Sequence, residues 1–270
     1  MPGLGFFKMS GSGNDFVVVD ARTDPHEELQ IPAMIQKICA RGTGVGADGI
    51  VLLAAEAGVD FRMIYHNADG SRASMCGNAA LCCTRLATEL AQGQGRELRF
   101  MTDSGLVAGR VRDGRPEIDL APVSVLQPDA PVHTARGERR IGFAVAGVPH
   151  LTVIVDDLEG CDVAARGRAL RFAPELGPEG ANANFVAREG SGWAMRTYER
   201  GVEAETLACG TGAVASAILI ESWGLAKGPV DLRTRSGKTL SVKLRRSGTE
   251  WFPTLAGEGR IVFRGEFAEI

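Results

Sequence analysis

Two matched blocks of sequence constrain the fold of this chain more than any other feature. The blocks are 76-CGNAALC-82 and 209-CGTGAVA-215, in which a cysteine and a glycine begin an apolar, alanine-rich run. A polar turn with acidic residues precedes each block, and Cys76 and Cys209 lie 133 residues apart. Each block predicts a helix that begins directly after its cysteine. The matched pair predicts a chain built from two similar halves.

Other landmarks recur at nearly the same spacing. The apolar strand patterns that follow Asn14 and His150 match at an offset of 136 residues, and the segments around Gly105 and Gly237 match at an offset of 132 residues. Such offsets are too long for a solenoid repeat. They indicate an internal duplication that produces two similar domains.

Size and composition agree with two globular domains. A chain of 270 residues is long enough for two domains that each bury a core. Hydrophobic residues make up 44% and charged residues 23%, as in ordinary globular proteins. The net charge is −3 and the basic residues are scattered, so we expect no nucleic-acid partner and no anionic membrane surface.

The expected location is the cytoplasm, with no membrane partner. The first residues lack the basic and apolar regions of a signal peptide, and no apolar run reaches the length of a membrane span. Six cysteines, most of them within apolar segments, fit a reducing compartment better than a disulfide scaffold.

Short strand patterns outnumber helix patterns in both halves. Helices are predicted in residues 31–41, 76–92 and 209–224, and the last two are apolar on nearly every side. A helix that is apolar all round is buried. We therefore predict an α/β (α+β) fold with two pseudo-symmetric domains, each a curved mixed β-sheet wrapped around a central buried helix.

The domain boundaries are predicted from the same patterns. An N-terminal domain over residues 1–121 carries Cys76, and the final strand at about 260–270 returns to it. A C-terminal domain over residues 122–259 carries Cys209. The proline-rich segment 122–133 is the predicted crossover between them.

Neither a nucleotide site nor a metal site is predicted. The segment 44-GVGADG-49 matches a dinucleotide-binding pattern, but a predicted helix precedes it and a strand follows, which reverses the required order. The four histidines are scattered, and neither C-x-x-C nor H-E-x-x-H occurs. We expect no metal and no cofactor. The remaining cysteines are expected to act as small buried hydrophobes: Cys39, Cys82, Cys83 and Cys161.

The two cysteine blocks predict acid/base chemistry at a carbon atom. A thiol at a helix N-terminus meets unpaired N–H groups and the positive end of the helix dipole, which favours the thiolate. The glycine after each cysteine lets a substrate carboxylate approach those N–H groups. If Cys76 and Cys209 reach opposite faces of one carbon, one can remove a proton while the other delivers one, which inverts the stereochemistry. The same amides would stabilise an enolate-like intermediate.

Five blocks of the chain resemble the diaminopimelate epimerase family: 10-SGSGNDF-16, 40-ARGTGVGADGI-50, 67-NADGSRASMCGN-78, 149-PH-150 and 198-YERGVEAETLACGTGA-213. The resemblance runs from about Phe6 to Phe267. It implies a cofactor-independent isomerase that interconverts LL- and meso-diaminopimelate in lysine and peptidoglycan biosynthesis, with Cys76 and Cys209 as the catalytic pair. The expected partners are a small amino-acid substrate and a second copy of the chain in a homodimer.

The resemblance also implies a set of substrate-binding residues. Four residues would hold the carboxylate at the reacting carbon through their amides: Gly77, Asn78, Gly210 and Thr211. Five would offer side chains to the rest of the ligand: Asn14, Asn67, Asn182, Glu199 and Arg200. His150 would lie beside the reacting centre. A glutamate and an arginine together offer an acceptor for an ammonium group and a fork for a second carboxylate.

Two alternative functions stay open from the sequence. One is a cofactor-independent racemase of another amino acid, such as histidine. The other is a thiol redox protein or a small-ligand binding protein, although a redox protein normally has a resolving cysteine in C-x-x-C spacing. Two positions differ from the family pattern. Val148 stands where an asparagine is common, and Leu81 lies where a glycine and an arginine are usual after the first cysteine.

Overall fold

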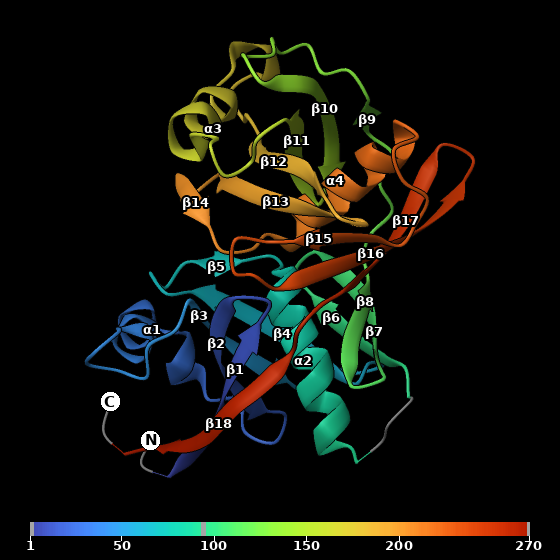
Figure 1. Cartoon of the computed structure of the whole chain (residues 1–270). Helices are drawn as coiled ribbons and strands as arrows, with labels where there is room; N and C mark the ends of the chain where they lie inside the picture. Colours follow the sequence, from blue (N-terminus) through green and yellow to red (C-terminus); the bar gives the residue numbers. More distant parts are fainter. Residues whose placement is uncertain (1–2, 93–95, 269–270) are drawn as a thin grey trace. The chain divides into compact units, whose positions relative to one another are not determined.

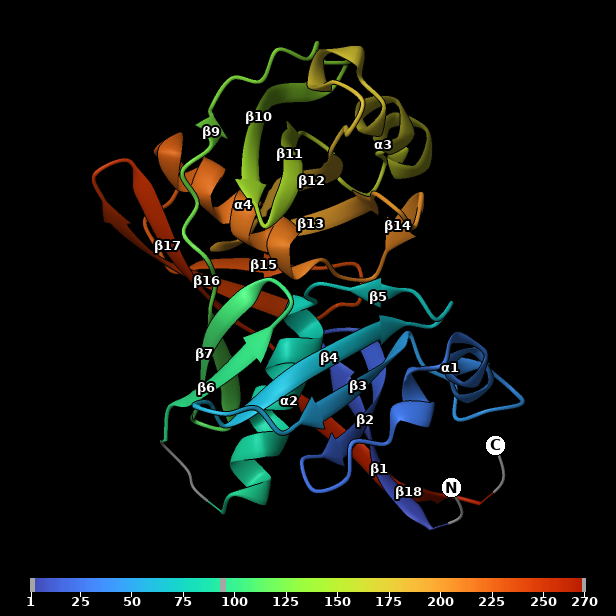
Figure 2. The ribbon, with the colours of Figure 1, turned by 180° about the vertical axis from the view of Figure 1, so that it is seen from behind.

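The computed structural model describes residues 3–92 and 96–268, and the chain divides into two compact units (Figures 1 and 2). Unit 1 is Met1–Ile118 with Ala256–Ile270, and unit 2 is Asp119–Leu255. Each unit mixes strands and helices, so the predicted α/β class is confirmed. The last two residues of the expected final strand, 269–270, lie outside the described residues.

The strands of unit 1 form a mixed sheet. Along the sheet, β18, β1 and β2 pair antiparallel, β2 and β3 parallel, β3 and β4 antiparallel, β4 and β6 parallel, and β6 and β7 antiparallel. The elements are β1 (Leu4–Gly11), β2 (Asn14–Ala21), the 3₁₀ helix η1 (Glu27–Gln30), α1 (Pro32–Cys39), β3 (Gly49–Ala54), β4 (Phe61–Asn67), β5 (Arg72–Ala73), α2 (Gly77–Leu90), β6 (Leu98–Thr102), β7 (Gly105–Arg112), β8 (Arg115–Asp119) and β18 (Arg260–Phe267).

Unit 2 repeats this pattern of strand directions. The order β9, β10, β11, β12, β13, β15, β16 follows the same alternation, with parallel pairs at β11–β12 and β13–β15. The elements are β9 (Leu126–Gln127), β10 (Glu138–Ala146), β11 (Val148–Val155), α3 (Val163–Arg171), the 3₁₀ helix η2 (Pro174–Leu176), β12 (Asn182–Glu189), β13 (Gly192–Glu199), β14 (Ala204–Thr206), α4 (Gly210–Ser222), β15 (Val230–Arg233), β16 (Thr239–Ser247) and β17 (Glu250–Ala256).

The first hairpin of each unit relates the positions of one unit to those of the other. Gly11 pairs with Asn14 across the turn between β1 and β2, and Ala146 pairs with Val148 across the turn between β10 and β11. Asn14 therefore corresponds to Val148, because each residue begins the second strand of its hairpin.

His150 corresponds to Phe16, so the sequence match of His150 with Asn14 is wrong by two residues. Phe16 and His150 are each two residues along the second strand, β2 or β11. The apolar residues of β2 and β11 are similar enough to be aligned in more than one way. The pairing of residues across each hairpin permits only the alignment of Phe16 with His150. The turn in unit 2 contains Gly147 alone, one residue fewer than the turn in unit 1, so the offset between matching positions changes by one residue across the turn.

The same register continues across both sheets. Val51 of β3 pairs with Tyr65 of β4 in unit 1, and at the matching position Asn184 of β12 pairs with Thr197 of β13 in unit 2. Apolar and aromatic positions of one unit are thus polar positions of the other.

Helices α2 and α4 are buried, as their sequences predict. Eleven of the 14 residues of α2 are buried, and so are ten of the 13 residues of α4. In both views, α2 lies against the strands of unit 1 and α4 against those of unit 2 (Figures 1 and 2). Because each helix is covered on nearly all sides, small and apolar residues occupy its whole circumference.

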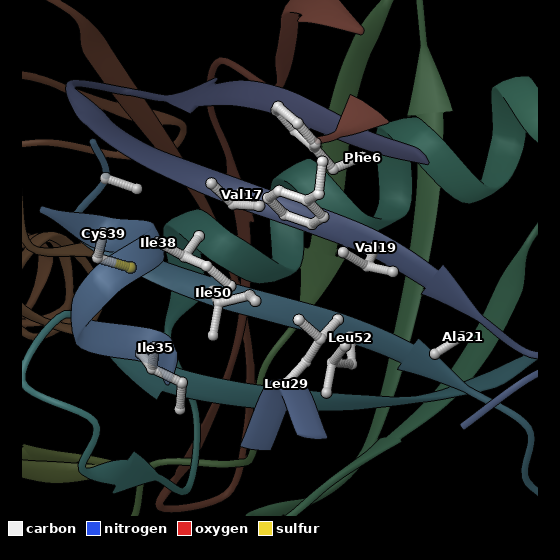
Figure 3. Close-up of a cluster of buried hydrophobic side chains, with 12 residues drawn as sticks. Phe6, Val17, Val19, Ala21, Leu29, Ile35, Ile38, Cys39, Ile50 and Leu52 are labelled. Carbon is white, nitrogen blue, oxygen red and sulfur yellow. The ribbon is translucent and has the colours of Figure 1, made fainter. Parts of the chain in front are cut away.

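The opposite face of each sheet carries a second apolar layer. In unit 1, Val17 and Val19 of β2 and Ile50 of β3 pack with side chains from α1 and η1 (Figure 3). Side chains alternate along a strand, so the intervening residues face α2. In unit 2, Ala183 and Phe185 of β12 pack toward α3 in the same way. The intervening residues of β12 therefore face α4.

Among the described residues, no helix has both the length and the hydropathy needed to cross a membrane.

Candidate active site

Each predicted catalytic cysteine is the residue that caps the start of a buried helix. Cys76 precedes α2 with φ −134° and Cys209 precedes α4 with φ −132°, so both have extended backbone. Their carbonyls accept the first helical hydrogen bonds, from Ala80 N at 2.9 Å and Ala213 N at 3.0 Å. The N–H groups of the residues just after each cysteine have no partner within the helix. Those groups belong to four predicted site residues: Gly77, Asn78, Gly210 and Thr211.

In unit 1 the first turn of α2 connects to an ion pair at the surface. Asn78 Nδ2 donates to Asn14 Oδ1 at 2.7 Å, and Asn14 Nδ2 donates to Asp48 Oδ2 at 3.0 Å. The exposed Arg41 donates to Asp48 Oδ1 at 2.7 Å and to Asp15 Oδ1 at 2.6 Å. Both sides of the Asn14 amide are therefore engaged, and this orients the Asn78 side chain.

Asn67 lies where β4 ends and the turn to β5 begins. Its Oδ1 accepts from Tyr65 Oη at 2.9 Å, and its Nδ2 donates to Ser71 Oγ at 3.0 Å. Phe16 packs edge-on against Tyr65, with ring centroids 5.9 Å apart. The side chain of Asn67 thus stabilises this turn, which leads toward Cys76.

In unit 2 the first turn of α4 connects to a buried histidine. His150 Nε2 lies 3.0 Å from Thr211 Oγ1, and Thr211 Oγ1 lies 3.5 Å from Cys209 Sγ. His150 is fully buried. Burial, with a smaller contribution from the positive charge of Arg200, lowers the pKa of His150 to about 3. His150 is neutral at physiological pH, and the structure links it to Cys209 through Thr211.

Three more predicted residues meet at the end of β13. Asn182 Oδ1 accepts from the backbone N–H of Arg200 at 2.7 Å, and the Arg200 guanidinium donates to Glu179 Oε2 at 3.2 Å. Burial raises the pKa of the Glu199 carboxyl above its usual value. Asn182 therefore fixes the backbone that presents a glutamate and an arginine side by side.

The patterns in the sequence do not predict a role for Asn184. It lies on the face of β12 toward α4 and contacts two other polar side chains, His150 and Thr197. Its Nδ2 lies 3.2 Å from His150 Nδ1. Gly212 packs directly against it, since a Cβ at Gly212 would clash with Asn184 Oδ1 and lie 3.3 Å from Cys209 Cβ. A signal exists in the segment 182-NANFVA-187, where two asparagines share one face of an apolar strand.

The other cysteines are poor candidates for thiolate chemistry. Burial raises the pKa of all four of them: Cys39 to about 11, and also Cys82, Cys83 and Cys161. A protonated thiol is a weak base and nucleophile. Within the residues that the structure describes, no three His, Cys, Asp or Glu side chains gather in a way that could hold a metal ion.

The chain is similar to one well-defined family over almost its whole length. The family model described as diaminopimelate epimerase matches residues 6–125 and 143–258. A diaminopimelate epimerase from Gemmatimonas aurantiaca is 47% identical, and the match covers 98% of this chain and 99% of that one. A diaminopimelate epimerase from Aquifex aeolicus is 42% identical, with 98% of both chains covered.

Solved structures share the fold at much lower identity. A PhzF-family phenazine biosynthesis protein from Bacillus anthracis has a TM-score of 0.73 at 16% identity, over 99% of both chains. A probable proline racemase from Agrobacterium radiobacter has a TM-score of 0.71 at 18% identity, over 98% of this chain and 92% of that one. Several enzyme families therefore share this architecture.

Proposed function

Because the chain belongs to the diaminopimelate epimerase family, we propose that it interconverts LL- and meso-diaminopimelate, with Cys76 and Cys209 as the two acid/base groups. The observation that carries this proposal is the pair of matched helix starts, each with a cysteine at the cap position. The other four thiols have raised pKa values and do not compete for this role.

The proposed reaction uses backbone and thiol groups only. The α-carboxylate binds to the N–H groups of the first helical turns, where the helix dipole favours an anion. One cysteine, as thiolate, removes the α-proton. The negative charge that develops on the carboxylate as it becomes enolate-like is stabilised by the same N–H groups. The other cysteine, as thiol, delivers a proton to the opposite face. The chemistry requires both sulfurs to reach the same carbon.

The distal end of the substrate carries an ammonium and a carboxylate group. We assign their recognition to side chains near the two helix starts: Asn14, Asn67, Asn182, Glu199 and Arg200. The Arg200 guanidinium, whose pairing partner Glu179 is exposed, is available to bind a carboxylate in a bidentate manner. The Glu199 carboxyl supplies an acceptor for the ammonium group. His150, neutral and buried, serves to orient Thr211 and does not transfer protons itself.

Deuterium incorporation tests this function directly. The reduced, metal-stripped protein is incubated in deuterated water with LL-diaminopimelate, and mass spectrometry follows the α-position. We expect one deuteron to enter as meso product forms, without added cofactor. Cys161→Ser, which removes a half-buried thiol remote in sequence from both helix starts, is the matched control and should retain the wild-type rate. Exchange that depends on an added metal or cofactor would contradict the proposal.

The same assay separates the alternatives. Faster exchange with histidine or another simple amino acid would identify a racemase with a different substrate. Reversible thiol oxidation coupled to a reductant, without any α-exchange, would identify a redox protein.

We also propose a homodimer in the cytoplasm. Strand β18, paired with β1, leaves the apolar side chains of Val262 and Phe263 each 46% exposed, and we assign this strand to the contact with the second copy. Cys39, Cys82, Cys83 and Cys161 form no disulfide bond, which fits a reducing compartment such as the cytoplasm. Light scattering should give twice the mass of the chain. Val262→Glu with Phe263→Glu should give the monomer, and a monomeric wild type would refute the dimer.

A further inference from the structure

A chain of hydrogen bonds runs through the interior of unit 2, and its proton positions can be assigned from one backbone carbonyl. Asn184 Nδ2 donates to Leu151 O at 2.8 Å, and a carbonyl oxygen can only accept. This contact fixes which end of the Asn184 amide is nitrogen. The amide oxygen then accepts from Thr197 Oγ1 at 3.0 Å. Asn184 and Thr197 are both buried, so neither exchanges these partners for water.

The fixed amide of Asn184 determines the tautomer of His150. The second Nδ2 hydrogen points to His150 Nδ1 at 3.2 Å, and because an amide nitrogen cannot accept, Nδ1 must be the acceptor. A neutral imidazole with an accepting Nδ1 carries its hydrogen on Nε2. The pKa of His150, lowered to about 3 by burial, keeps the ring neutral across the working range of pH.

The Nε2 hydrogen in turn sets the direction of the Thr211 hydroxyl. His150 Nε2 lies 3.0 Å from Thr211 Oγ1 and must donate to it. The hydroxyl hydrogen is then left for Cys209 Sγ, at 3.5 Å. A hydrogen bond donated to sulfur stabilises the thiolate more than the thiol, because an ionised acceptor forms the stronger bond.

We propose that Asn184 and Thr197 are positioning residues that, through the Nε2–H tautomer of His150, hold the Thr211 hydroxyl as a hydrogen-bond donor to the Cys209 sulfur. These four residues, Thr197, Asn184, His150 and Thr211, are called the relay below. The catalytic consequence rests on the proposed function, because it makes Cys209 a better base. The proton positions themselves do not depend on any substrate.

The relay is particular to unit 2. At the corresponding positions of unit 1, Phe16 replaces His150 and Val51 replaces Asn184. Neither carries a polar side-chain atom, so this arrangement of donors and acceptors cannot form there.

Charged and titratable groups on the elements around α4 can also influence the pKa of Cys209. Besides His150 on β11, the end of β13 brings Glu199, followed by Arg200. Strand β14 brings Glu205, which is paired with Arg196. The remaining charged groups lie on four elements. Strand β10 carries Arg140, which lies over the Trp223 ring, and β12 carries Arg188 and Glu189. Strand β16 carries Lys243, Arg245 and Arg246, and α4 itself carries Glu221. All of them stay unchanged in the variants below, so differences among the variants report on the relay.

The experiment measures the pKa of Cys209 without any turnover. In a Cys76→Ser background, the rate of alkylation by iodoacetamide is followed from pH 5 to 10 by mass spectrometry of the Cys209 peptide. Thr211→Val removes the donor and should raise the apparent pKa by about 1 unit, the size expected for one hydrogen bond to a charged group. Thr211→Ser keeps the hydroxyl and should restore the wild-type value. Asn184→Leu should shift the pKa in the same direction as Thr211→Val.

Thr152→Val is the matched control. Thr152 lies on the same face of β11 and bonds Ser216 Oγ at 3.2 Å, outside the relay. The substitution removes a buried hydroxyl and places at this position the residue found at the matching Val18, so the pKa of Cys209 should not move.

Nitrogen-15 spectra of the histidine rings give the second measurement. The His150 signals, assigned by their loss in His150→Gln, should show hydrogen on Nε2 alone in the wild type and a mixture of tautomers in Asn184→Leu. Equal pKa values for Thr211→Val and Thr211→Ser would overturn the proposal, and so would hydrogen on Nδ1 in the wild type. Because neither measurement uses diaminopimelate, a failure of the relay and a failure of the proposed activity give different results.

Discussion

The two helix starts share their backbone but differ in the side chains beneath them. Cys76 and Cys209 have nearly the same φ, and each is followed by a glycine in a buried helix. Beneath α4 lie His150 and Asn184, where unit 1 has Phe16 and Val51. Both units therefore keep a helix start whose backbone N–H groups are available to an anion, while the side chains around each thiol differ. In the proposed mechanism, carboxylate binding then depends on the backbone of each helix start, and the pKa of each thiol depends on the side chains around it.

The second residue of each helix shows the same divergence. Asn78 connects through Asn14 and Asp48 to the exposed Arg41, whereas Thr211 connects inward to a neutral, buried His150. Salt weakens an exposed ion pair but barely affects hydrogen bonds among buried neutral groups. Salt should therefore weaken the contacts at the start of α2 and leave those at the start of α4 nearly unchanged.

The largest expected effect is the loss of either catalytic thiol. Cys76→Ser and Cys209→Ser should each lower kcat by about 10²–10⁴-fold, because a serine hydroxyl is too weak an acid to form the base near neutral pH. Steady-state epimerisation gives the rate, and circular dichroism confirms that each variant is folded. Near-normal turnover in one variant would show that the two cysteines are not both required, and it would remove that cysteine from the mechanism.

Oxidation should inactivate the enzyme reversibly. If both sulfurs reach one carbon, they must approach each other closely, and accessible thiolates then form a disulfide. Activity should fall in air and return with a thiol reductant. Peptide mapping of the inactive protein should show Cys76 joined to Cys209. A link between Cys39 and Cys82 instead would contradict the proposed approach of the two thiols.

If Glu199 and Arg200 bind the distal end of the substrate as proposed, the length of the substrate should matter. Arg200→Met should raise KM and lower kcat, because remote binding energy helps to assemble the reacting geometry. A combined loss of about 10- to 100-fold in kcat/KM is expected, the size of one lost hydrogen bond to a charged group. Lysine and histidine should be poor substrates of the wild type for the same reason. A variant with unchanged kinetics would show that Arg200 does not contact the ligand.

Stability should depend on pH through His150. Its pKa is about 3 in the folded protein against 6.5 for an unperturbed histidine, so the unfolded chain binds a proton first as the pH falls. This contribution is therefore fully present above about pH 6.5 and is lost progressively toward pH 3, at up to about 1.4 kcal/mol per pH unit. In His150→Gln, the free energy of unfolding measured with urea should depend less steeply on pH in this range. His133→Gln, at an exposed site, is the control and should not.

The smallest effect is expected at the surface end of the unit 1 cluster. Arg41→Gln should change the free energy of unfolding by no more than about 1 kcal/mol, because the guanidinium is exposed and salt screens its pairs with Asp15 and Asp48. The difference from wild type should shrink further in high salt. A loss that is several times larger, or insensitive to salt, would mean that unit 1 also relies on a shielded network.

The parts of the fold that the sequence predicts are those with a strong local pattern. Helices α2 and α4 are recognisable because burial on all sides makes them continuously apolar. Helix α3 has only three buried residues among nine, so its pattern is too weak to predict a helix. The strand register depends on the length of the turn at Gly147, which apolar runs do not encode.

The site divides in the same way. The position of each cysteine and its following glycine at a helix start could be predicted, because it depends on the local sequence pattern alone. Asn184 could not, because its role depends on a parallel pairing of β11 with β12 that brings it next to His150, 34 residues earlier in the chain. A contact between two strands that are distant in the sequence depends on how the sheet is connected, and no local sequence pattern predicts it.

The close packing of Gly212 on Asn184 also bears on how this protein can change by mutation. No side chain fits at position 212 while the asparagine amide occupies its place. A side chain at 212 requires the Asn184 amide to move or to be replaced by a smaller group, and either change disturbs the contact between Asn184 and His150. Substitutions at positions 184 and 212 should therefore depend on each other, because a side chain at 212 needs the space that the Asn184 amide occupies.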